Sequence, residues 1–314
     1  MPLRIVFMGT AELACPSLRA LNRFAGFHVA AVVTQPDKPG GRHLQLHPSP
    51  VKQTALAGNL PVLQPLRARD GDFIAELRRL QPDLIVVAAY GQILPQAILD
   101  LPPHGCLNIH TSLLPKYRGA SPIQTALLND EAETGVTIMK MDAGLDTGPM
   151  LACQATPIAP ADNAETLHDR LAQIGAELIV QTIPGYVAGH ISPQPQPAQG
   201  VSHAPKIKKH DGLLDWKLPA RQLWNRIRAF TPWPGAFTYL PPPPGVRMLK
   251  IWRAEVVPLS GPPAQILRSD KSGLTVACGR DALHLSLLQL EGGRRLNAQQ
   301  FAAGHVIIPG QTLG

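Results

Sequence analysis

The chain of 314 residues is 45% hydrophobic and 5% aromatic and carries a formal net charge of +7, an ordinary composition for a protein with more than one domain. No apolar run is long enough to cross a bilayer, and the first residues lack a charged and then apolar leader, so we expect neither a membrane span nor a signal peptide. Its four cysteines are scattered, which predicts reduced thiols in a cytoplasmic protein.

The amino-terminal residues predict a β-α-β unit. Arg4–Met8 and His28–Thr34 are short apolar runs that predict strands, and the apolar spacing from Glu12 to Phe24 predicts a helix between them. This unit implies a parallel sheet of Rossmann-like topology. The turn after the first strand offers only Gly9 and no G-x-G-x-x-G pattern, so no dinucleotide cofactor is expected.

Residues 35–50 (QPDKPGGRHLQLHPSP) predict a long loop that contains Lys38 and Arg42. Loops of this length in compact domains are usually functional or disordered. The basic side chains suit a phosphate-bearing partner, and a solvated surface loop is an equally good interpretation. Beyond the loop, helices are predicted at Val51–Ala57 and Asp70–Leu80, with a short strand at Val62–Gln64.

A strongly apolar strand is predicted at Asp83–Ala89, where nearly every side chain could be buried. It ends at Tyr90 and Gly91. Ligands of open α/β sheets bind beyond the carboxyl ends of the strands. The stretch from Tyr90 to Leu94 is therefore a candidate binding wall.

The stretch LNIHTSLLPKYRG, residues 107–119, begins as a strand and carries the main candidate site. Asn108 and His110 are two residues apart, so their side chains should share one face of the strand. An amide donor beside an imidazole suits attack on a carbonyl, which requires both stabilisation of an oxyanion and transfer of a proton.

Three interpretations compete for this stretch. His104, Cys106 and His110 could bind a metal, but no second close pair supplies the remaining ligands. Thr111 or Ser112 could act as a nucleophile beside His110, but no G-x-S-x-G turn is present. A noncovalent acyl-transfer site needs the fewest absent parts, and no metal is expected.

An acid for this site comes from further along the chain. After a helix predicted at Ser121–Leu128 and a strand at Val136–Met141, a glycine-rich loop carries Asp142 and Asp146. Either carboxylate could orient or charge His110, although aspartate in such a loop often serves turn chemistry.

The last third of the chain is basic. Residues 201–314 have a net charge of +9, whereas residues 1–200 have a net charge of −2. This asymmetry favours a polyanionic partner, most simply nucleic acid, over a solubilising surface. The Pro- and Gln-rich Ile191–Gly200 predicts a semi-extended linker, and Lys206–His210 is a basic run at the domain junction.

Helices and short strands complete the predicted carboxyl-terminal half. The expected helices are Asp162–Val187 and Pro219–Phe230, and the expected strands are Ala236–Leu240, Arg247–Val257, Ala264–Leu267, Leu274–Ala277 and Ala282–Leu288. Short strands at this spacing, separated by turn signals, predict a small antiparallel barrel.

Taken together, these motifs resemble the folate-dependent formyltransferases. SLLPKYRG at 112–119 carries the family resemblance, and ETGVTIMKMDAGLDTGPML and RAFTPWPG point to the members that formylate methionine on initiator tRNA. The MGT turn, TQPDKPGGR with SPVK, VVAAYGQILP and the basic last third extend the resemblance over nearly the whole chain. The combination is highly specific, whereas no single motif is.

The resemblance implies a Rossmann-like catalytic domain at residues 1–189, a linker at 190–207 and an OB-like tRNA-binding domain at 208–314. It implies that 10-formyltetrahydrofolate is the formyl donor and that the α-amino group of initiator methionyl-tRNA is the acceptor. We expect a monomer. The rival functions are formyl transfer to a small amine such as a nucleotide sugar or glycinamide ribonucleotide, folate-dependent hydrolysis, and RNA binding without catalysis.

Residue by residue, the resemblance implies Asn108, His110 and Asp146 as the catalytic trio. The implied folate contacts are Ser112, Leu113, Leu114, Pro115, Tyr90, Gly91 and Ile93. Arg42 matches the insertion that reaches the tRNA acceptor end, and the further candidate tRNA contacts are Lys38, Lys206, Lys208 and Lys209. Thr111 departs from the family, where Gly is frequent, without replacing a member of the trio.

Overall fold

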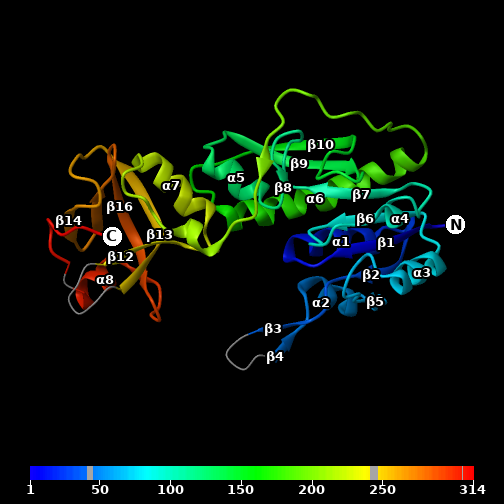
Figure 1. Ribbon diagram of the computed structural model, residues 1–314, viewed down its shortest axis with the longest axis horizontal. Helices are drawn as coiled ribbons and strands as arrows, with labels where there is room; N and C mark the ends of the chain where they lie inside the picture. Colours follow the sequence, from blue (N-terminus) through cyan, green and yellow to red (C-terminus); the bar gives the residue numbers. More distant parts are fainter. Residues whose placement is uncertain (41–44, 241–246, 306) are drawn as a thin grey trace. The chain divides into compact units, whose positions relative to one another are not determined.

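The computed structural model describes residues 1–40, 45–240, 247–305 and 307–314 (Figure 1). The chain divides into two compact units. The first contains Met1–Pro122, Glu133–Pro157 and His168–Ala204, and the second contains Ile123–Ala132, Ile158–Leu167 and Pro205–Gly314. None of the helices among the described residues combines the length and hydrophobicity needed to cross a membrane.

The first unit is built on a seven-stranded mixed sheet with the order β10-β9-β7-β6-β1-β2-β5. Its parallel strands are β1 (Leu3–Gly9), β2 (Phe27–Val33), β5 (Val62–Leu63), β6 (Leu84–Ala88) and β7 (Cys106–His110). Two antiparallel strands, β9 (Glu133–Lys140) and β10 (Met150–Pro157), extend one edge. The parallel part confirms the Rossmann-like topology, and β10 is an additional strand that the sequence did not predict.

The helices of this unit cover both faces of the sheet. They are η1 (Glu12–Ala14), α1 (Cys15–Arg23), α2 (Pro50–Ala57), α3 (Gly71–Leu80), α4 (Gln96–Leu99) and much of α6 (Ala164–Val187). On one face, Val87 of β6 packs in an apolar cluster with Phe73 of α3 and Ile98 of α4. On the other face, Gly175 of α6 lies so close to Ile109 that an added Cβ would be 2.7 Å from its Cγ2. Since strand side chains alternate, Asn108 and His110 occupy the face opposite Ile109.

A short hairpin lies within the stretch predicted as a long loop. The strands β3 (Lys38–Gly40) and β4 (Gln45–His47) pair in antiparallel register. The proposed tRNA contact Arg42 lies outside the described residues. Three residues on each side give too little alternation for a sequence pattern to predict strands.

The second unit contains a six-stranded antiparallel sheet with the order β12-β13-β16-β15-β14, and β17 pairs with β16. The strands are β12 (Ala236–Leu240), β13 (Arg247–Val257), β14 (Ile266–Asp270), β15 (Gly273–Ala277), β16 (Ala282–Leu290) and β17 (Leu296–Asn297). Helix α7 (Ala220–Ala229) packs on the sheet, with Leu223 and Ile227 in its core. This antiparallel domain confirms the second part of the predicted fold class.

Short helices and one further strand pair complete the described elements. Helix α8 (Ala298–Gly304) was not predicted, and it begins with a capping box between Asn297 and Gln300. Helix η2 (Lys209–Gly212) and helix α5 (Pro122–Leu128) are short. In the first unit, β8 (Arg118–Gly119) pairs with β11 (His203–Ala204).

Candidate active site

A cavity of about 570 Å³ opens where β6 and β7 end. The predicted residues that line it are Tyr90, Gly91, Ile93, Asn108, His110, Asp142 and Asp146. The cavity therefore brings together the predicted binding wall after β6, the polar pair on β7 and both candidate carboxylates from the loop after β9. A volume of this size is typical of small-molecule sites.

The loop between β9 and β10 distinguishes its two carboxylates. Asp142 accepts hydrogen bonds at Oδ1 from the Gly144 amide (3.1 Å) and from the Thr147 hydroxyl (2.7 Å). Asp142 therefore shapes the turn, as aspartate often does. Asp146 has a left-handed backbone with φ of 52°, and its carboxylate contacts the polar pair on β7.

Both carboxylate oxygens of Asp146 have a donor. Oδ1 accepts a hydrogen bond of 3.3 Å from the Asn108 amide nitrogen, and Oδ2 accepts one of 2.8 Å from the backbone amide of Gly119. Oδ2 also lies 3.8 Å from Nδ1 of His110. The acid thus contacts both polar residues of β7, and the side chains of His110 and Asp146 are only 7% and 15% exposed.

The other nitrogen of His110 fixes the state of the ring. Nε2 lies 3.0 Å from the carbonyl oxygen of Tyr117. A carbonyl can only accept, so Nε2 carries a hydrogen and Nδ1 is the nitrogen that gains or loses a proton. Nδ1 is the nitrogen that faces Asp146, which would stabilise the protonated ring.

Side chains from two other segments fix the backbone of the wall after β6. The carbonyl oxygen of Tyr90 accepts hydrogen bonds from the Thr10 hydroxyl (2.8 Å) and from the Gln35 amide (2.9 Å). Gly91 has φ of 81°, and a Cβ there would lie 2.6 Å from the Gln35 amide nitrogen. Burial raises the pKa of Tyr90 to about 12, so its hydroxyl stays neutral. Ile93 is exposed and gives this wall an apolar surface.

None of the residues Ser112–Pro115 lines the cavity; Ser112 and Leu114 are buried, and Leu113 and Pro115 are partly exposed. The Ser112 hydroxyl donates to the Lys116 carbonyl (2.6 Å). The Thr137 hydroxyl donates to the Ser112 carbonyl (2.7 Å) and accepts from the Leu114 amide (3.1 Å). The folate contacts expected for Ser112, Leu113, Leu114 and Pro115 therefore stay predictions. Thr111, the departure from the family pattern, does line the cavity.

The two alternative chemistries have less support. Burial raises the pKa of the Cys106 thiol to about 12, which makes it a poor metal ligand. Among the residues that the structure describes, no group of three or more His, Cys, Asp or Glu side chains could hold a metal ion. The Ser112 hydroxyl is already engaged by a carbonyl, and Nε2 of His110 bonds Tyr117, so no Ser–His nucleophile pair is formed.

A further contributor to the site, Gln196, was not predicted from the sequence. Its amide nitrogen donates to the carbonyl oxygens of Asp146 and Gly148, both at 2.8 Å. Its amide oxygen accepts from Arg118. Composition alone predicts a linker for the segment that contains Gln196. A contact between residues 50 positions apart has no local sequence pattern from which it could be predicted.

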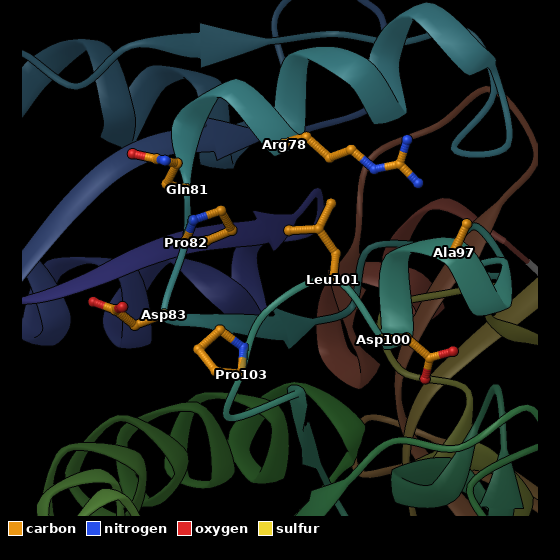
Figure 2. Close-up of a pocket in the computed structure, with 8 residues that line it drawn as sticks. All are labelled: Arg78, Gln81, Pro82, Asp83, Ala97, Asp100, Leu101 and Pro103. Atoms are coloured by element: carbon orange, nitrogen blue, oxygen red, sulfur yellow. The ribbon is translucent and has the colours of Figure 1, made fainter.

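A separate cavity of about 550 Å³ lies at the opposite, amino-terminal edge of the sheet (Figure 2). Arg78 and Gln81 come from the end of α3, Asp83 precedes β6, and Asp100 follows α4. This cavity shares no lining residue with the cavity of the trio. By the rule for open α/β sheets, the carboxyl-terminal edge is the better candidate for chemistry.

The predicted tRNA contacts in the described residues are exposed. Lys38 donates to the Gln35 side chain (2.7 Å) on the first unit. On the second unit, Lys206, Lys208 and Lys209 are exposed. Their position is compatible with binding a phosphate backbone, and their contact with tRNA stays a prediction.

The basic second unit also has an aromatic surface. A cavity of about 620 Å³ is lined by residues that include Trp233, Phe237 and Lys250. The guanidinium of Arg295 lies 3.7 Å from the ring centroid of Trp252, and Lys250 lies 5.7 Å from it. Trp233 itself is 52% exposed. Aromatic faces flanked by cations are typical of surfaces that bind unpaired nucleotides.

Comparison with known proteins identifies the class. The family model of the formyl transferases matches residues 3–183, and the model of the formyl transferase carboxyl-terminal domain matches residues 206–306. The chain therefore belongs to the formyl transferase family.

Within this family the chain is similar to proteins named methionyl-tRNA formyltransferase. The protein of Geobacter sulfurreducens is 51% identical over 312 residues, which cover 99% of this chain and 97% of the relative. That of Myxococcus xanthus is 49% identical over 307 residues, which cover 98% and 96% of the two chains.

Solved structures share the fold at low identity. The sugar 3N-formyl transferase WlaRD, solved in the presence of dTDP and 5-N-formyl-THF, is 20% identical with a TM-score of 0.64, over 91% of this chain and 98% of that chain. HypX from Aquifex aeolicus in complex with tetrahydrofolic acid is 16% identical with a TM-score of 0.62, over 95% of this chain and 46% of that chain. At this identity the likeness shows the fold alone.

Proposed function

We propose that this protein transfers a formyl group from 10-formyltetrahydrofolate to the α-amino group of initiator methionyl-tRNA. The observation that carries the proposal is the convergence of Asn108, His110 and Asp146 on one cavity. The family matches and the full-length similarity to methionyl-tRNA formyltransferases support the same reaction.

The geometry suits a direct transfer through a tetrahedral intermediate. The amine nitrogen attacks the formyl carbon, and negative charge develops on the formyl oxygen. The Asn108 amide bonds Asp146 through one N–H and has a second N–H to offer to that oxygen. This leaves Asp146 to hold the amide in place.

His110 handles the proton in this scheme. Nε2 is committed to the Tyr117 carbonyl, so Nδ1 takes the proton from the attacking amine and passes it to the departing folate nitrogen. Asp146, at 3.8 Å from Nδ1, stabilises the imidazolium that forms in between. The reaction exchanges a formyl group for a hydrogen, because the amine nitrogen loses one hydrogen and the folate nitrogen gains one.

The residues of the cavity are compatible with the folate donor. Gly91 and the exposed side chain of Ile93 form an apolar wall that could hold a pteridine ring. Bound there, 10-formyltetrahydrofolate would supply the activated formyl group. The contacts of Ser112 to Pro115 with folate remain part of the proposal.

Basic residues of the second unit support the assignment of tRNA as the acceptor. The +9 charge of residues 201–314 and the exposed cations Lys206, Lys208 and Lys209 suit a phosphate backbone. A small-amine acceptor such as a nucleotide sugar has no need of this basic unit.

The deciding experiment compares acceptors under one set of conditions. The protein is incubated with 10-formyltetrahydrofolate and either charged initiator tRNA or a dTDP-linked amino sugar, and formylated product is quantified for each. We expect N-formylmethionine on the tRNA and no formylated sugar. Transfer to the sugar alone would overturn the tRNA assignment while leaving the formyl transfer chemistry intact.

A further inference from the structure

The segment between α6 and β11 runs beside the edge strand β10 (Figure 1), with which it forms one bridge. Its residue Gln196 bonds the active-site loop. Gln194 and Met150 exchange backbone hydrogen bonds of 2.7 and 2.8 Å. Two residues later the half-buried Gln196 turns its side chain inward. Composition predicts a linker here, whereas the structure shows a segment bonded to the catalytic unit.

The Gln196 amide makes four hydrogen bonds that only one orientation satisfies. Its oxygen accepts from Nε (3.1 Å) and Nη2 (2.7 Å) of Arg118. Its nitrogen donates to the carbonyl oxygens of Asp146 and Gly148. A guanidinium can only donate hydrogen bonds, and a carbonyl can only accept them. The oxygen and the nitrogen of the Gln196 amide therefore each face partners of the complementary kind.

These bonds hold the acid of the site at its backbone. Asp146 is left-handed at φ 52°, a conformation that costs a non-glycine residue free energy and persists where neighbours fix it. Gln196 holds the carbonyl of Asp146, and the amide of Gly119 holds its carboxylate. Arg118, the partner of Gln196, immediately precedes Gly119.

The same segment also supports His110. The Ser202 hydroxyl accepts from the Tyr117 amide (3.0 Å), and the Ser202 carbonyl accepts from the Arg118 amide (2.9 Å). Tyr117 is the residue whose carbonyl bonds Nε2 of His110. The segment from Gln194 to Ala204 thus contacts the supports of both the acid and the imidazole.

We propose that Gln196 is a positioning residue for the reaction, which acts by holding Asp146 in register with Asn108 and His110. The proposal rests on the proposed formyl transfer. A misplacement of about 1 Å at a reacting group can cost on the order of 10²-fold in rate. Loss of the Gln196 bonds should therefore lower kcat by roughly 10- to 100-fold.

The test uses Gln196→Glu, which keeps the acceptor for Arg118 and replaces the donor to the two carbonyls by an oxygen. Gln196→Ala removes both the acceptor and the donor of the amide. It shows whether an effect of Gln196→Glu comes only from the new negative charge. The matched control is Gln194→Glu, the same change two residues earlier on an exposed side chain that donates to the Ser192 carbonyl. Melting temperatures of all variants report folding separately.

A double variant shows whether Gln196 acts through the acid. If it does, adding Gln196→Ala to Asp146→Asn should cost little more than Asp146→Asn alone, because the group being positioned is already gone. A merely structural role would multiply the two losses. We also expect the KM for each substrate to stay within about threefold, since neither substrate is bound by Gln196.

The results divide cleanly. A loss of kcat in both Gln196 variants, with the control near wild type and non-additive losses in the double variant, supports the proposal. A kcat within about threefold of wild type in Gln196→Glu, or losses that multiply, overturns it. Failure of the wild-type protein to formylate the tRNA would instead count against the proposed function, and the same comparison could then be run on whichever amine it does formylate.

Discussion

Nε2 of His110 donates to the carbonyl oxygen of Tyr117, seven residues further along the chain, at 3.0 Å. This one contact settles which nitrogen of the ring can exchange a proton, and it turns that nitrogen toward Asp146. Nε2 therefore has a structural role and Nδ1 has a chemical role. A substitution can keep the first role and remove the second.

Replacing His110 by Gln should lower kcat by about 10²- to 10⁴-fold, the usual contribution of a positioned acid or base. Glutamine can still donate to the Tyr117 carbonyl, so the fold should survive, but it cannot carry a proton at neutral pH. Steady-state formylation assays measure the effect. His104→Gln is the control, because His104 lies outside the cavity, and an equal loss there would point to general destabilisation.

Asn108→Ala removes the proposed oxyanion donor and should lower kcat by about 10²- to 10³-fold. Asp146→Ala should also abolish most turnover, since it leaves Nδ1 of His110 without its anionic neighbour. Binding of charged tRNA, measured by filter retention, should stay near wild type in both variants. Near-normal turnover in both would contradict the assignment of the trio.

Gly148→Ala should destabilise the loop that carries Asp146. A Cβ at this position would lie 1.8 Å from the backbone oxygen of Lys140, so the chain must move. We expect a loss of roughly 1–3 kcal/mol in the free energy of unfolding and a drop in kcat. Chemical denaturation checks the first and the formylation assay checks the second.

Gly71→Ala provides the comparison for that prediction. Gly71 begins α3, and nothing lies within 4 Å of an added Cβ. Alanine is the better helix former, so this variant should be as stable as wild type or slightly more stable. Equal stability of both glycine variants would show that the loop adapts without cost.

In the second unit, a pH-dependent ion pair joins Arg221 and Asp130. Arg221 donates to both carboxylate oxygens of Asp130, at 2.9 and 2.7 Å, and this hydrogen bonding lowers the pKa of Asp130 below its usual 3.8. A lowered folded-state pKa means that the stabilisation is present above about pH 4 and is lost as the pH falls through the folded-state value. Both side chains are about half exposed, so the pair contributes at most about 1 kcal/mol.

Asp130→Asn isolates this charge, because asparagine tolerates the left-handed backbone (φ 55°) that Asp130 adopts. Urea unfolding should show the variant less stable than wild type at pH 7, with a difference that shrinks in high salt and disappears in acid. A difference that persisted at low pH would assign the effect to packing and not to the ion pair.

The sequence was sufficient for the elements whose pattern is local. Asn108 and His110 share a face because strand periodicity requires it, and the apolar run before Tyr90 became β6, which is buried on both sides. The choice between Asp142 and Asp146 was open because both lie in one glycine-rich loop. It was decided by hydrogen bonds within the folded loop, which no spacing rule contains.

The features that could not be predicted depend on long-range contacts or on weak patterns. Strand β10 is an edge strand with much of its length exposed, so it lacks the apolar alternation that marks a strand. The segment Ser112–Pro115 matches a family motif, but only the fold shows that it packs against Thr137. The role of Gln196 could not be predicted, because its hydrogen-bond partners are distant in the sequence and its sequence neighbours are prolines.

The hydrogen bonds of the segment from Gln194 to Ala204 bear on where this protein can be cut. A fragment that stops at residue 189, the predicted end of the catalytic domain, would keep all three proposed catalytic residues but lose Gln196, Ser202 and the β11 partner of β8. Such a fragment should be difficult to obtain in active form. Limited proteolysis near the exposed Gly200 should likewise end activity before it disrupts the rest of the sheet.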